Sequence, residues 1–149
     1  MNRNTVEELL DFAISEEAAA VTFYTRLAER ADKPAMREAF EGFAAEEAEH
    51  KSKLLAVKAG ASLGPADQPV MDLKIADYLV DVEPGDDMSY QDALVMAMKK
   101  EKAAFKLYSD LAAAAEDENT RAIFLALARE EAKHKLRFEI EYDDMMADN

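Results

Sequence analysis

The 149 residues contain two histidines, and each follows a glutamate by three positions: His50 follows Glu47, and His134 follows Glu131. Residues three apart lie on the same face of an α-helix, so each pair presents a carboxylate and an imidazole to one cation. Both groups are donors for divalent transition metals. The spacing therefore predicts two helical metal-binding pairs.

Two further glutamates each interrupt an otherwise apolar helical face. An unpaired buried carboxylate costs several kcal/mol or takes up a proton, whereas two divalent cations neutralise four converging carboxylates. We therefore predict a carboxylate-bridged di-metal site in a bundle core. Oxygen-rich ligation with one nitrogen per metal suits iron or manganese, and zinc would also bind. The predicted metal ligands are Glu17, Glu47, His50, Glu101, Glu131 and His134.

A lone Glu-x-x-His usually marks a solvated helix surface, and two in repeat register argue against that interpretation. Tyr24 and Tyr108 lie two turns beyond the lone glutamates, where they hydrogen-bond ligand carboxylates or donate electrons, or only pack in the core. Glu46 and Glu130 are also repeated but lie off the inward faces. We expect them to be solvated or to support the ligands.

A helical hairpin occurs twice in the chain. Residues 11–54 align with residues 95–138 at an offset of 84 without a gap, giving sixteen identities in 44 positions. Alanine bias inflates such a match between helices, but it does not explain His, Tyr, Arg and paired Glu in register. The two halves are therefore interpreted as copies of one hairpin.

Capping signals delimit four helices. Thr5 and Ser89 stand at cap-like spacings, Pro34 suits a first helical turn, and Gly60 is a stop signal. The predicted helices cover residues 5–31 and 34–58, a third begins near 89, and a fourth follows a break at 116–119.

Each predicted helix has one inward face with residues spaced by threes and fours. The first and third faces are Leu10, Ala13, Glu17, Ala20, Tyr24, Leu27, Ala31 and Leu94, Ala97, Glu101, Ala104, Tyr108, Leu111, Ala115. The second and fourth are Met36, Phe40, Phe43, Glu47, His50, Leu54, Val57 and Thr120, Phe124, Leu127, Glu131, His134, Phe138, Glu141.

The two hairpins are joined by a connector of different composition, because three of the four glycines and three of the four prolines lie between Gly60 and Gly85. We predict one all-α domain over residues 1–149, a four-helix bundle of two repeated hairpins with a long crossover. Repeat 1 covers about residues 5–58, the crossover 59–88 and repeat 2 about 89–146. Within the crossover, Val70 to Val82 is either a short helix or an extended segment.

Composition excludes several classes of function. The chain is 50% hydrophobic and carries 32 acidic against 18 basic side chains, a formal net charge of −14. This argues against nucleic acid and an anionic membrane surface as partners, since both attract clustered Lys and Arg. Residues 1–12 carry three acids where a signal peptide needs an apolar run, so we expect a cytoplasmic protein. Without cysteine, disulfides and thiolate metal sites are excluded.

At these motifs the sequence resembles the ferritin-like superfamily, and within it the rubrerythrin-related proteins. The resemblance covers roughly residues 5–58 and 89–142 and rests on four motifs: Ala13-Ile14-Ser15-Glu16-Glu17 leading to Phe23-Tyr24, Glu46-Glu47-Ala48-Glu49-His50, Glu101 leading to Tyr108, and Glu130-Glu131-Ala132-Lys133-His134. It implies a ferritin-like bundle with two iron ions per chain on the six residues named above. It also implies reduction of hydrogen peroxide to water by the reduced centre.

The sequence departs from that family in two ways. Rubrerythrins carry a rubredoxin-like iron site on four cysteines, and these 149 residues hold none, so the electrons must come from a separate donor such as a rubredoxin. Rubrerythrins also have an additional glutamate one turn away on the third helix, where Met98 and Ala104 flank Glu101 here. The six-ligand set is thereby closer to the bacterioferritin arrangement.

Three classes of function are compatible with these residues. The first is a di-iron oxidoreductase acting on hydrogen peroxide or dioxygen. The second is a ferroxidase that serves iron storage, although Ala48 stands where resemblance to bacterioferritin would need a haem-ligating Met. The third is a metal-binding structural bundle without turnover. For assembly we expect a homodimer, because exposed apolar helix faces commonly pair isologously.

Overall fold

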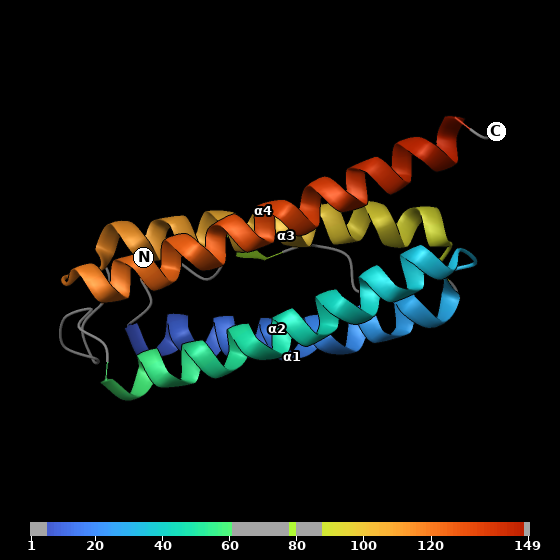
Figure 1. Ribbon diagram of the computed structural model, residues 1–149. Coiled ribbons are helices and arrows are strands. Elements are labelled where there is room, and N and C mark those ends of the chain that lie inside the picture. Colours follow the sequence, from blue (N-terminus) through green and yellow to red (C-terminus); the bar gives the residue numbers. More distant parts are fainter. Residues whose placement is uncertain (1–5, 61–77, 80–87, 148–149) are drawn as a thin grey trace.

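The computed structural model describes residues 6–60, 78–79 and 88–147, and within these ranges it contains four α-helices and no strand (Figure 1). The prediction of an all-α, four-helix chain is therefore confirmed. The helices are α1 Val6–Arg30, α2 Pro34–Gly60, α3 Tyr90–Ala114 and α4 Glu118–Ala147.

The helices pack as two hairpins. Helix α1 runs along α2, α3 runs along α4, and the two hairpins lie side by side (Figure 1). Most of the predicted crossover, including nearly all of Val70 to Val82, lies outside the described residues. Of that stretch only Tyr78 and Leu79 are described.

Local side-chain chemistry sets the helix ends. The Ser89 hydroxyl accepts a hydrogen bond from the Asp92 backbone N–H at 3.0 Å, and an Asp117 carboxylate oxygen accepts one from the Thr120 N–H at 2.7 Å. Each satisfies a donor that has no partner within its helix. Pro34 is the first residue of α2, as predicted, whereas the predicted cap at Thr5 lies outside the described residues.

The arginine that recurs in the repeat closes both hairpin turns. The Arg37 guanidinium donates to the Ala31 carbonyl at 3.2 Å, and the Arg121 guanidinium donates to the Ala115 carbonyl at 3.3 Å. The last carbonyls of a helix have no intrahelical N–H donor, so each arginine ties the end of one helix to the start of the next. The same contact therefore occurs in both copies of the hairpin.

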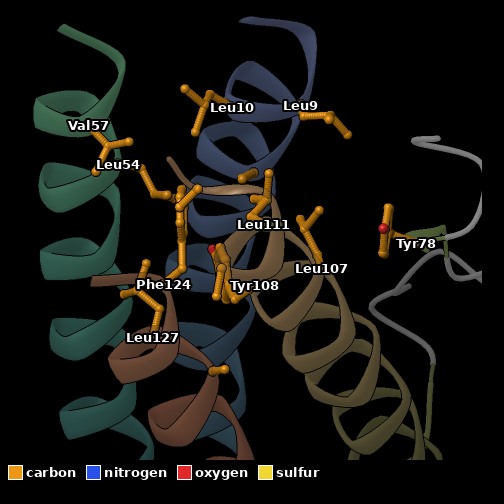
Figure 2. Packing of buried hydrophobic residues seen from close by; sticks show 14 residues of the cluster. Leu9, Leu10, Leu54, Val57, Tyr78, Leu107, Tyr108, Leu111, Phe124 and Leu127 are labelled. Atoms are coloured by element: carbon orange, nitrogen blue, oxygen red, sulfur yellow. The ribbon is translucent and has the colours of Figure 1, made fainter. Parts of the chain in front are cut away.

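The core consists of two apolar clusters with a polar layer between them. One contains Leu54, Leu111 and Phe124 (Figure 2), and the other contains Phe40 and Phe138. Along every helix, the predicted metal ligands fall between the residues of these two clusters.

The predicted inward faces are buried with three exceptions. Ala20, Ala104 and Phe43 are half-buried. All three line openings in the bundle surface. Among the described helices, none is long and apolar enough to span a membrane.

The turn contacts of Arg121 predict a measurable loss of stability when they are removed. We expect Arg121→Ala to lower the free energy of unfolding by about 1 kcal/mol, because the carbonyls of Ala112 and Ala115 each lose a hydrogen bond from the guanidinium. Urea denaturation followed by circular dichroism measures the change. Arg129→Ala is the control, since Arg129 is exposed on the same helix, and an equal loss in both variants would contradict the prediction.

Candidate metal centre

All six side chains predicted as ligands meet in the polar layer at the middle of the bundle. Helices α1 and α3 each contribute one glutamate, and α2 and α4 each contribute a glutamate and a histidine. Every one of the six is at most 2% exposed: Glu17, Glu47, His50, Glu101, Glu131 and His134.

The donor atoms form two overlapping groups of four. One group is Glu17, Glu47, His50 and Glu131, the other is Glu47, Glu101, Glu131 and His134, and within each group the atoms lie within 4.8 Å of one another. Glu47 and Glu131 belong to both groups. These two carboxylates could therefore each contribute to both cations of a two-metal site, and Glu17 and Glu101 could each contribute to one.

Both imidazoles turn Nδ1 toward the carboxylates. His50 Nδ1 lies 2.9 Å from Glu17 Oε2 and 3.1 Å from Glu131 Oε1. His134 Nδ1 lies 3.2 Å from Glu47 Oε1 and 3.3 Å from Glu101 Oε2. Donor atoms this close together could bind one cation.

Buried side-chain atoms that make no hydrogen bond are concentrated at this site. Among the described residues, every buried side-chain nitrogen or oxygen that lacks a hydrogen-bond partner belongs to these six side chains. The atoms are both oxygens of Glu47 and of Glu131, one oxygen each of Glu17 and Glu101, and both Nδ1 atoms. Such atoms cost free energy unless a ligand satisfies them. The set supplies four donors to each of two cations.

Burial shifts the acid equilibria of the carboxylates. It raises the pKa of Glu17 to about 8 and that of Glu101 to about 7, and it raises the pKa of Glu131 well above its ordinary value. The pKa of Glu47 is lowered, because contacts with His134 and the other neighbours outweigh the effect of burial. Without cations, the site therefore holds protons on part of its carboxylates.

The pKa values of both histidines are shifted in the direction opposite to the effect of burial. Burial disfavours the imidazolium, but the adjacent carboxylates outweigh it and raise the pKa of His50 to about 9 and that of His134 to about 11. Cations that bind the Nδ1 atoms must displace these protons.

Each tyrosine that we singled out contacts a glutamate of the opposite hairpin. The Tyr24 hydroxyl of α1 donates a hydrogen bond to Glu101 Oε1 of α3, and Tyr108 of α3 is hydrogen-bonded to Glu17 of α1. Burial raises the pKa of both tyrosines well above its ordinary value, so both hydroxyls keep their protons at neutral pH. Tyr24 therefore fixes the carboxylate of Glu101, and Tyr108 fixes that of Glu17.

The repeated Glu46 and Glu130, left between two interpretations by the sequence, contact the outer side of the imidazoles. Glu46 pairs with His134 Nε2, and Glu130 pairs with His50 Nε2. Each pair joins α2 to α4. A carboxylate on the outer nitrogen of a ligating histidine fixes the ring and its tautomer. The repetition of these acids in register was the available signal, but the exchange of partners between hairpins is visible only in the structure.

A cavity of about 150 Å³ reaches the cluster between α1 and α3. Its inner wall includes Glu17 and Glu101, and its sides include Ala20 and Ala104. The described part of the crossover borders it, and Tyr78 is held there by a 2.7 Å hydrogen bond to Asp110. The small alanine side chains leave space beside the carboxylates.

Comparison with known proteins agrees with this fold and site. The family model described as rubrerythrin matches residues 8–75 and 92–149. No curated protein sequence matches the chain.

Two solved structures are similar to the whole chain. One is described as a ferritin-like diiron-carboxylate protein from Thermotoga maritima; it has 18% identity and a TM-score of 0.84, and the match covers 97% of this chain and 99% of that one. The other is a hypothetical protein from Pyrococcus furiosus with 28% identity and a TM-score of 0.74, covering 96% and 91%. The predicted ferritin-like bundle is thereby confirmed.

The shifted pKa values predict that the metal-free protein loses stability as the pH rises from 6 to 9. In the folded protein the pKa of Glu17 is about 8 and that of His50 about 9, whereas their ordinary values are 4.5 and 6.5. Between these values the folded state holds protons that the unfolded chain has released. Stability falls wherever the folded state binds more protons. We expect the melting temperature to drop by about 5 °C or more. Excess Zn²⁺ should reverse the slope, and a pH-independent melting temperature without metal would contradict the prediction.

Substitution of Glu46 or Glu130, which contact the outer nitrogens of the histidines, should lower the affinity for metal although every proposed ligand is retained. Glu130→Gln and Glu46→Gln should each weaken metal binding about 10- to 100-fold, because the ring that they orient loses its carboxylate partner. Competition with a chromophoric chelator measures the affinity. Glu49→Gln, exposed on α2, is the control and should bind as tightly as the wild type.

Proposed function

The chain belongs to the rubrerythrin family, and on this premise we propose that its centre holds two iron ions and reduces hydrogen peroxide with electrons from a separate protein. The observation that carries the proposal is the set of eight buried, unpaired donor atoms, divided into two groups that share Glu47 and Glu131. Four carboxylates and two neutral imidazoles balance the charge of two divalent cations. Oxygen donors with one nitrogen per cation favour iron or manganese.

The proposed reaction consumes two electrons and two protons and converts one hydrogen peroxide into two water molecules. Bound iron supplies the two electrons and a site for the O–O bond. Tyr24 and Tyr108 keep their phenolic protons and hold Glu101 and Glu17 in position. The apolar clusters shield the reacting layer on both sides along the bundle axis.

The size of the cavity between α1 and α3 favours a small, uncharged molecule as the oxidant. Its volume of about 150 Å³ accommodates a few molecules the size of water, and it ends on the carboxylates of the centre. The rest of the lining consists of alanine, leucine and aromatic side chains together with Glu16 and Lys100. Hydrogen peroxide fits this space and chemistry.

The test is to load the metal-free protein with two equivalents of Fe²⁺ without oxygen and to mix it with hydrogen peroxide in a stopped-flow instrument. We expect oxidation of two irons per peroxide, faster than the reaction with dioxygen. Glu47→Ala, which removes a shared carboxylate, should slow the reaction at least about 100-fold. Glu49→Ala, exposed two residues away, is the matched control. Equal rates for the wild type and Glu47→Ala would refute the proposal, and faster oxidation by dioxygen would favour a ferroxidase.

Ala104→Leu tests the role of the cavity within the same experiment. The longer side chain narrows the passage to the cluster while every proposed ligand is retained. Iron binding should persist and the reaction with peroxide should slow.

A further inference from the structure

A second opening lies between α2 and α4, away from the cavity that reaches the carboxylates. It is an open groove with a volume of about 340 Å³. The side chains that line it are Ala35, Glu38, Ala39, Phe43, Lys133 and Arg137. None of them is among the proposed ligands.

An aromatic side chain connects this groove to the centre. The half-buried Phe43 ring lies on the imidazole of His134, with ring centroids 4.2 Å apart and planes inclined by 32°. The Nδ1 atom of the same imidazole faces Glu47 and Glu101. The groove is therefore separated from the metal-ligating atoms by two rings in contact.

The rim of the groove on α4 is basic and apolar. Lys133 and Arg137 are exposed one turn apart, and Arg137 is oriented by a contact with Met36 Sδ at 3.4 Å. The exposed Leu136 and Ile140 continue the same part of α4, at 57% and 47% exposure. The α2 side of the groove carries one acid, Glu38, and the α4 rim carries the two cations. In a chain with a net charge of −14, these two neighbouring cations could contact an acidic surface of a partner protein.

The internal repeat does not reproduce the residues of this groove at the other end of the centre. At the offset of 84, the counterparts of Lys133 and Arg137 are Glu49 and Lys53, and the counterpart of Phe43 is Leu127. Leu127 is fully buried. The end that holds His50 therefore has an aliphatic cover and an acidic residue where the His134 end has an aromatic ring and a lysine.

We infer that this groove is the docking site of an electron-carrier protein with acidic side chains around its redox group, and that electrons pass through Phe43 and His134. The inference rests on the proposed function, which needs two electrons per peroxide. Each encounter oxidises the carrier by one electron and reduces the centre by one, so two encounters restore it. Weak electron-transfer complexes use small, open, polar surfaces with complementary charge, and this groove is such a surface.

The kinetic test uses a reduced, negatively charged rubredoxin and protein loaded with ferric iron, mixed without oxygen and without peroxide. In the double variant Lys133→Glu/Arg137→Glu, the second-order rate of rubredoxin oxidation should fall at least about tenfold at low ionic strength, with a weaker salt dependence. Lys53→Glu reverses the charge at the counterpart of Arg137 and should stay within about twofold of the wild type. Equal rates in wild type and double variant, or an equal loss in the control, would overturn the inference. Lys133→Gln/Arg137→Gln replaces the double variant if it does not fold.

A second measurement separates docking from electron transfer. In ¹⁵N-labelled, metal-free protein titrated with the same rubredoxin, the amides of residues 35–43 and 133–140 should shift. Phe43→Leu should keep this binding but lower the limiting rate of rubredoxin oxidation. Shifts confined to other helices would overturn the inference.

The two proposals fail separately. If chemically reduced protein does not react with peroxide while rubredoxin still reduces the ferric protein through the groove, the proposed function fails and the docking site stands. If peroxide oxidises the protein but charge reversal has no effect on rubredoxin, the docking site fails alone.

Discussion

Four carboxylates converge in the buried middle of the bundle, and the architecture depends on how their negative charge is compensated. The carboxylates are buried between two apolar clusters, so repulsion between them and their attraction to cations are both stronger than at the surface. Without cations, protons on Glu17 and Glu101 and on the imidazoles carry part of this compensation. Stability and metal binding are therefore properties of the same six side chains.

The two hairpins interlock at this centre rather than merely packing side by side. Tyr24 reaches Glu101, and Glu130 reaches His50, so both kinds of contact join one hairpin to the other. Their counterparts repeat the same exchange in the opposite direction. A ligand set that is symmetric in sequence is thus held by a symmetric set of contacts between hairpins. The symmetry is broken where the half-buried Phe43 has the buried Leu127 as its counterpart.

Periodicity predicted the helices and their inward faces because burial in a bundle follows the helical repeat directly. Thus the face of α4 from Thr120 to Glu141 is buried throughout. The exceptions, Ala20, Ala104 and Phe43, could not be found this way, since their exposure depends on the distance between helices. Ala20 on α1 and Ala104 on α3 line a cavity, whereas the other alanines on these two faces are buried. Most of the crossover falls outside the described residues, so its predicted form is untested.

The sequence by itself determined which six side chains share the middle of the bundle. The spacing of residues along a helix determines which of them share a face, and the alignment of the two repeats determines their position along the bundle axis. Only the tertiary structure decided that Glu47 and Glu131 belong to both donor groups, while Glu17 and Glu101 each belong to one. It also decided that each outer glutamate pairs with the histidine of the other hairpin. These are relations between helices, and they depend on the distance and rotation of one helix against another, which no periodicity within a helix encodes.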